Sequence, residues 1–121
     1  MTPSDALDLT DLQARFPGGV FPANCPSRTL LDHVMSKWGV LVLVSLAERS
    51  HRWSELRRRA EGVSEKMLAQ TLKTLEADGF VHREQQPVMP PRVDYSLTPA
   101  GRDLAALLRP LLGWLADHAS E

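Results

Sequence analysis

The chain has 121 residues, of which 43% are hydrophobic and 24% charged, and this composition suits one globular domain with a single core. No apolar run approaches the roughly 20 residues that span a bilayer, and no signal-peptide pattern is present, so we expect a cytoplasmic protein without a membrane partner. The net charge of −1 conceals a basic middle, because residues 49–92 hold nine basic and six acidic side chains, and a nucleic-acid partner is therefore not excluded.

The first 24 residues carry the weakest pattern. Leu9, Leu12 and Phe16 have the spacing of a short amphipathic helix, and the Pro-Gly-Gly run that follows would end it. A docked helix and a frayed arm both remain open for this stretch. We therefore divide the chain into a partly ordered N-terminal arm, residues 1–24, and a folded domain, residues 25–119.

Two helices are expected next. The first opens at Cys25 and Pro26, since proline is tolerated in a first helical turn. Its apolar stripe is formed by Leu30, Leu31, Val34 and Met35. The second runs from residue 36 or 37 to residue 47, and its valines and leucines could also form a buried strand. We predict a buried helix, because four apolar residues repeat at helical spacing: Trp38, Leu41, Val42 and Leu46.

A short helix is predicted over residues 55–60. Residues 51–53 form a short extended piece, and Ser54 has a side chain that can cap the helix that follows. Leu56 would face inward. The outward positions are held by Arg57, Arg58 and Arg59.

A longer helix is predicted over residues 63–78, and Gly62 joins it to the short helix of residues 55–60. Ser64 can accept a hydrogen bond from the free amides of its first turn, and Gly79 suits the left-handed conformation that ends a helix. A short helix, a glycine turn and an amphipathic second helix are typical of a helix-turn-helix.

This second helix has two unlike faces when it is wound at about 100° per residue. The apolar face holds Met67, Leu68, Thr71, Leu72 and Leu75. The opposite face holds Lys66, Ala69, Gln70 and Lys73. Its polar side chains and lack of bulky apolar residues suit insertion into a major groove, where side chains meet base edges and phosphates. The alternative is an ordinary surface helix with solvated lysines.

A β wing is predicted after this helix. Residues 80–84 and 92–97 read as two strands around a proline-bearing loop, residues 85–91. Val93, Tyr95 and Leu97 share one face of the second strand. The prolines before Arg92 would hold this arginine outward, at a backbone phosphate or a minor groove. The alternative is that Arg92 pairs with Asp94.

A last helix is predicted from Thr98 and Pro99 to about residue 119, with threonine as its cap and proline in its first turn. Its apolar face exceeds what one small domain readily covers, and a symmetric dimer would bury the excess. The alternative is that the helix folds over its own core. The predicted dimer interface comprises Leu30, Leu104, Leu108, Leu111, Leu112, Trp114 and Leu115.

Five strings of the sequence occur in an order that can be compared with known families. They are CPSR at residues 25–28 with KW at 37–38, WSELRR at 53–58, SEKML at 64–68, LKTLEADG at 72–79 and PPRVDYSLTPAG at 90–101. As a set they resemble the HxlR-type transcriptional regulators, close relatives of the MarR group, over roughly residues 25–116. Residues 1–24 are not part of this pattern, and Trp53 stands where a phenylalanine is commoner.

The resemblance implies a mainly α fold with a small β wing, a winged helix-turn-helix that dimerises through its terminal helices and binds palindromic operators in double-stranded DNA. It also implies that some members sense oxidants or electrophiles through the cysteine at the position of Cys25. Cys25 directly precedes a helix and is close to Arg28 in the sequence, and both features stabilise a thiolate. The alternative is a cysteine packed as a small apolar residue at the subunit contact.

The residues that we expect to contact DNA are Ser64, Glu65, Lys66, Gln70, Lys73, Arg58 and Arg92. Gln70 could pair with the major-groove edge of adenine, and Glu65 could accept a hydrogen bond from cytosine. Lys66 and Lys73 would meet phosphates or guanine, and the two arginines would hold the backbone.

No catalytic or metal-binding set is recognisable in the sequence. The 4 histidines lie on separate predicted elements without ligand spacing, and there is no nucleophile-base-acid set or glycine-rich phosphate loop. We therefore expect no enzyme, no metal and no cofactor. The predicted function is a sequence-specific dimeric DNA-binding transcriptional regulator that represses, with a small-molecule or oxidant inducer. The alternative is a winged-helix module that binds a protein and not DNA.

Overall fold

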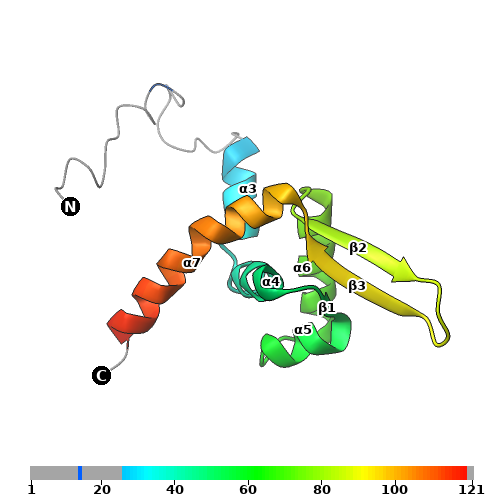
Figure 1. Cartoon of the computed structure of the whole chain (residues 1–121). Helices are drawn as coiled ribbons and strands as arrows, with labels where there is room; N and C mark the ends of the chain where they lie inside the picture. The colour runs from blue at the N-terminus through cyan, green and yellow to red at the C-terminus, as the bar shows by residue number, and fades with distance from the viewer. Residues whose placement is uncertain (1–13, 15–25, 120–121) are drawn as a thin grey trace. The chain divides into compact units, whose positions relative to one another are not determined.

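The computed structural model describes residue 14 and residues 26–119. The chain divides into two units, residues 1–32 and residues 33–121. The helix α3 (Pro26–Val34) begins in the first unit. The second unit holds α4 (Lys37–Glu48), β1 (His51–Arg52), α5 (Trp53–Arg59), α6 (Glu65–Ala77), β2 (Val81–Gln86), β3 (Arg92–Leu97) and α7 (Pro99–Ala119), in the order shown in Figure 1. Except for Ala14, the predicted N-terminal arm lies outside the described residues, as does Cys25.

The apolar helix α4 supplies the centre of the core. Its residues Val42, Leu43 and Leu46 are almost completely buried, so the predicted buried helix is confirmed and the alternative of a strand is not realised. Ser36 starts this helix by accepting a hydrogen bond from the backbone N–H of Gly39 at 3.0 Å. The helix α3 ends one residue before Met35, which was predicted to continue its apolar stripe.

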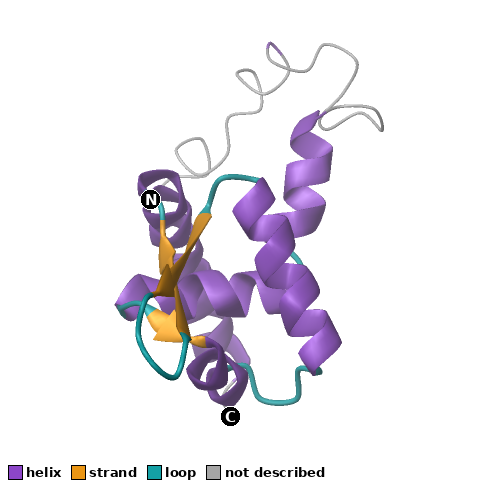
Figure 2. Cartoon of the chain, turned by 90° about the vertical axis from the view of Figure 1, so that its right-hand side faces the viewer, coloured by secondary structure: helices purple, strands orange, loops and turns teal. Residues whose placement is uncertain are grey.

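The strands form one antiparallel sheet in the order β1-β3-β2 (Figure 2). The hairpin register pairs Val81 with Leu97 at its base and Gln86 with Arg92 at its outer end. The predicted wing is thereby confirmed, although β2 begins one residue later and ends two residues later than the sequence indicated. The strand β1 lies within the predicted extended piece, residues 51–53, and it pairs with β3 through His51 and Tyr95.

The helix α5 starts differently from the prediction. Ser54 does not cap it, because the helix already begins at Trp53 and Arg52 occupies the cap position. The cap is made by Glu55, whose Oε1 accepts a hydrogen bond from the backbone N–H of Arg52 at 2.9 Å. This hydrogen bond to the charged carboxylate is the main reason why the pKa of Glu55 is lowered.

The helix α6 has both of the predicted end signals. Ser64 accepts a hydrogen bond from the backbone N–H of Met67 at 3.0 Å, and Gly79 has a φ of +86°. The helix is shorter than the predicted range 63–78, because Ser64 is its extended N-cap and Asp78 its C-cap, which leaves Val63 before the helix. Met67 was assigned to the apolar face, yet it is 43% exposed.

The helix α7 begins at a junction with the end of α6. The Thr98 hydroxyl donates to the Gly79 carbonyl at 2.6 Å and accepts from the backbone N–H of Gly101 at 3.0 Å, which confirms the predicted cap. Gly101 lies so close to Phe80 that a Cβ on it would overlap the Phe80 carbonyl oxygen. Among the described residues, no single helix is both long and apolar enough to cross a membrane.

Replacement of Gly101 by alanine tests this junction. Gly101→Ala should lower the free energy of unfolding by about 1–3 kcal/mol, because the added methyl group has to displace backbone. Gly113→Ala is the matched control, since a Cβ there meets open space and alanine favours helix by about 0.5–1 kcal/mol over glycine. Urea denaturation at one protein concentration measures both, and equal stability of the two variants would contradict the close approach.

Candidate nucleic-acid interface

The outer face of α6 presents three polar side chains at helical spacing. Lys66, Gln70 and Lys73 are exposed, and none has a hydrogen bond or ion pair with a described residue. The small side chain of Ala69 lies among them and that of Ala77 follows one turn after Lys73, so no bulky apolar group on this face hinders a close approach. The structure thus keeps together the three groove-facing residues that the sequence predicted.

The start of α6 is tied to α5. Glu65 forms an exposed ion pair with Arg57, with 3.4 Å between Oε1 and Nη1. The Ser64 hydroxyl oxygen accepts a hydrogen bond in the helix cap, so its O–H and its second lone pair are left for a partner. Glu65 and Arg57 also border a hollow of about 490 Å³ together with Arg58, which is exposed and has no partner among the described residues.

Arg92 has a partner within the wing. Its Nε lies 3.4 Å from Oδ1 of Asp94, and the Oδ2 atom of Asp94 accepts a hydrogen bond from Gln86 Nε2 at 3.0 Å. The pairing that the sequence left open as an alternative is therefore the observed arrangement. The Arg92 side chain is still 47% exposed, and an ion pair in contact with water contributes little stability, so it can be exchanged for a stronger anion.

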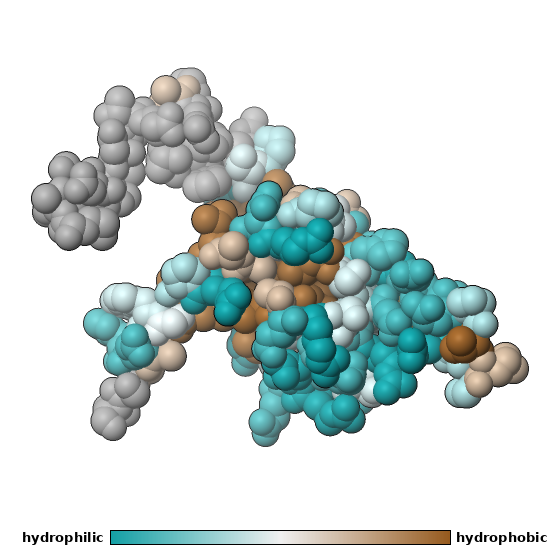
Figure 3. Space-filling model, in the orientation of Figure 1, coloured by the Kyte–Doolittle hydropathy of each residue, from teal (hydrophilic) through white to brown (hydrophobic). Residues whose placement is uncertain are grey.

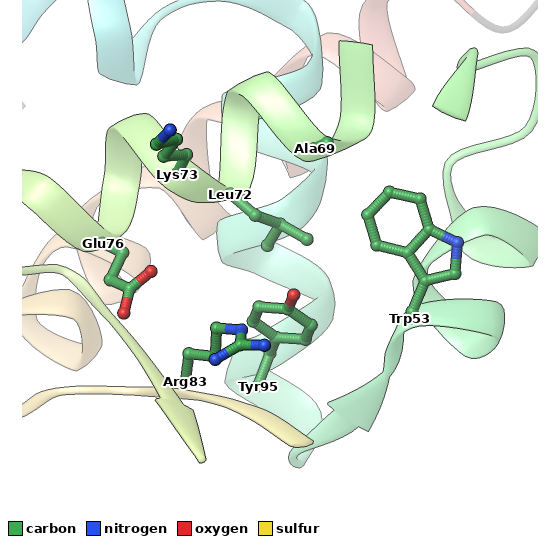
Figure 4. Close-up of a pocket in the computed structure, with 7 residues that line it drawn as sticks. All are labelled: Trp53, Ala69, Leu72, Lys73, Glu76, Arg83 and Tyr95. Atoms are coloured by element: carbon green, nitrogen blue, oxygen red, sulfur yellow. The ribbon is translucent and has the colours of Figure 1, made fainter. Parts of the chain in front are cut away.

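A second cavity, of about 350 Å³, lies between α6 and the sheet (Figure 4). Lys73 and Glu76 border it from α6, Arg83 and Tyr95 from the strands, and Trp53 from the start of α5. Arg83 belongs to the basic middle, residues 49–92, but the sequence pattern did not predict it as a site residue. The strand alternation could have identified it, because Arg83 lies two residues after buried Val81 and directly opposite Tyr95.

The predicted dimer residues of α7 fall into two groups. Leu108 is buried in the core, and Leu104 and Leu112 pack against it. The exposed group continues towards the C-terminus, where Leu111 is 38% exposed, Trp114 57% and Leu115 46%. Figure 3 shows hydrophobic surface gathered around α7, whereas the face over α5 and the hairpin is hydrophilic apart from the wing tip. Leu30 lies on α3, within the first unit.

Three of the 4 histidines contact neighbouring groups of the fold, and His82 is exposed on β2. His33 Nδ1 lies 2.7 Å from Oδ2 of Asp78, and His51 Nε2 lies 3.1 Å from the Ser45 carbonyl oxygen. His118 stacks on Trp114. Within residues 26–119, no group of three or more His, Cys, Asp or Glu side chains could hold a metal ion.

Comparison with known proteins identifies the family. The model of the HxlR-like helix-turn-helix matches residues 33–121. YtfH of Escherichia coli strain K12, an uncharacterized HTH-type transcriptional regulator, is 54% identical over 104 residues, which cover 86% of this chain and 82% of YtfH.

Solved structures give the same result. The ytfH structure from Salmonella typhimurium is 52% identical with a TM-score of 0.76, and the match covers 81% of this chain and 88% of that one. The redox regulator HypR in its oxidized form is 34% identical with a TM-score of 0.72, and the match covers 80% of this chain and 99% of HypR. Such relatives are regulators and not enzymes. The chain belongs to the HxlR-like helix-turn-helix family and is a transcriptional regulator with a winged-helix fold.

Proposed function

We propose that this regulator binds operator DNA, with α6 in the major groove and the hairpin on the backbone. The observation that carries the proposal is the exposed, unpaired set of Lys66, Gln70 and Lys73 on one face of a helix whose two ends are capped. Gln70 reads a base edge at the centre of this face, while Lys66 and Lys73 meet phosphates or guanine. Ser64, Glu65, Arg58 and Arg92 surround this set and complete the interface.

A homodimer would present two such helices to a palindromic operator. Leu111, Trp114 and Leu115 support this step, because they form an apolar stripe on α7 beyond the part that its own core covers. A two-fold dimer formed through this stripe and through Leu30 would place its recognition helices about 34 Å apart, one turn of DNA.

Repression follows from occupation of promoter DNA by this dimer. An inducing signal would change the angle between the subunits, so that the two helices no longer match the spacing of the half-sites. Cys25 is the proposed receptor of an oxidant or electrophile, which is supported by the similarity to HypR, a redox regulator. With 1 cysteine in the chain, its oxidised form would be an intersubunit disulfide, a mixed disulfide or an adduct.

The alternative, a module that binds a protein and not DNA, does not account for the basic surface of α6. A module that binds a protein through the apolar stripe of α7 requires no free cations on α6. Lys66 and Lys73 are free, and Arg58 and Arg83 are exposed nearby without partners among the described residues. A cluster of unpaired cations of this kind attracts a phosphate backbone.

Substitutions on α6 should separate the two kinds of DNA contact. Lys73→Ala should weaken binding to all duplex sequences about equally and lower the slope of log affinity against log salt by roughly one unit, because one phosphate contact is lost. Gln70→Ala should leave the slope unchanged and relax the preference at one base pair. Fluorescence anisotropy over a salt series measures both effects. Wild-type protein that shows no salt-dependent binding to any duplex would contradict DNA binding.

A charge placed on the apolar stripe of α7 should dissociate the dimer. Leu111→Asp should reduce the mass in solution from about twice 13.5 kDa to 13.5 kDa, because a buried carboxylate would lack a partner at the subunit contact. Ala116→Asp is the matched control, since Ala116 lies on another side of α7 and is exposed. Analytical ultracentrifugation gives the mass, and a wild-type monomer would overturn the dimer.

Oxidation should act on DNA binding through Cys25. Diamide should weaken operator binding by the wild type and leave Cys25→Ser unaffected, because serine cannot form a disulfide. Thiol reductant should restore the wild type. Equal losses in both proteins would remove Cys25 from the mechanism.

A further inference from the structure

The cavity of about 350 Å³ between α6 and the sheet contains polar groups without partners. Figure 4 shows the Arg83 guanidinium and the Tyr95 ring between Glu76 on one side and Trp53 on the other. The charged groups of Lys73, Glu76 and Arg83 form no hydrogen bond or ion pair with any residue that the structure describes. The Tyr95 hydroxyl and the Trp53 indole N–H are also without such a partner.

The chemistry of these groups selects an anion that accepts hydrogen bonds. Guanidinium, ammonium and indole groups only donate, and a phenol hydroxyl can donate. Lys73 and Arg83 supply two positive charges and Glu76 one negative charge, so the cavity favours a ligand with a single negative charge. A phosphodiester carries one negative charge and two unesterified oxygens that can each accept hydrogen bonds.

The position of the cavity agrees with the path of a DNA strand. A helix about 10–12 Å in diameter nearly fills a major groove about 12 Å wide, so the sugar-phosphate backbones pass along its two flanks. Glu76 lies on the flank of α6 that faces the sheet, and Lys73 lies at the edge of the groove-facing set next to this flank, where both border the cavity. On the opposite flank, Asp78 Oδ2 lies 2.7 Å from His33 Nδ1, so this carboxylate already has a partner.

We propose that this cavity binds one backbone phosphodiester of the operator, with Arg83 as the charged donor. This inference rests on the proposed DNA binding. The Tyr95 hydroxyl and the Trp53 indole N–H add neutral hydrogen bonds from the walls. Tyr95 is 8% exposed, so its ring is fixed by packing and its hydroxyl needs no reordering when the phosphate enters. This phosphate seat lies between recognition helix and wing and sets the depth of α6 in the groove.

The charge of Arg83 can be tested by a salt series on one duplex. Arg83→Gln should weaken binding at least about tenfold at low salt, on operator and unrelated sequences alike, and lower the salt slope by roughly one unit. Arg83→Lys should keep the slope. Arg109→Gln is the control of equal charge change, because Arg109 is exposed on α7 outside the cavity. Tyr95→Phe should weaken binding several-fold without any change of slope, since no charge is lost.

A scan of single neutral methylphosphonate linkages in the operator locates the phosphate. At one linkage per half-site, the replacement should weaken wild-type binding and leave Arg83→Gln unaffected. If wild-type protein binds DNA but no linkage distinguishes it from Arg83→Gln, or Arg83→Gln binds like Arg109→Gln, the phosphate seat is wrong and DNA binding stands. If wild-type protein binds no duplex at all, the proposed function fails and the seat with it.

Discussion

The arrangement of the functional elements depends on the junction where α6, the wing and α7 meet. The Thr98 hydroxyl is bonded to both Gly79 and Gly101, and the Thr98 backbone N–H donates to the Phe80 carbonyl at 3.1 Å. The end of α6, the base of the hairpin and the first turn of α7 are thereby held by three hydrogen bonds among four residues. Gly101 is needed because no side chain fits against Phe80. A movement of α7 in a dimer would therefore be passed directly to α6 and the wing.

Much of this architecture could be predicted from local sequence, and the reasons for the differences are physical. Ser64, Gly79 and Thr98 act through neighbours in the sequence, so their roles at helix ends were readable. Ser54 was misassigned because Glu55 reaches back to the Arg52 amide and starts α5 earlier, and both side chains were plausible caps. The pairing of β1 with β3 joins residues more than 40 positions apart, which no local pattern reports. The candidate site differs in the same way. The polar face of α6 was predicted from local spacing, whereas the surroundings of Arg83 depend on α6 and on Trp53, which is distant in the sequence.

The terminal helix shows why an apolar pattern does not by itself define an interface. Leu104, Leu108 and Leu112 recur every four residues and lie against the core, while Leu111 and Leu115 recur on an adjacent face. Sequence periodicity describes both stripes as one broad apolar face. The extent of the core along α7 depends on α4 and β3, the elements that pack against this helix, and the core ends near Leu112. The excess apolar surface is therefore smaller than the sequence indicated and runs along one side of α7 from Leu107 to Leu115.

Acidic side chains within the basic middle, residues 49–92, determine which of its cations are already paired. Glu65 holds Arg57 and Asp94 holds Arg92, so these two arginines are positioned before any partner arrives. Arg58 and Arg83 have no partner among the described residues and lie at the two hollows that adjoin Trp53. A surface with all its cations free would attract any polyanion through the summed field, whatever its shape. Because neighbouring carboxylates offset part of that field, the net attraction is modest, and close binding requires phosphates placed where the free cations lie. Shape and spacing thus become more important than total charge, which is consistent with a chain whose formal net charge is −1.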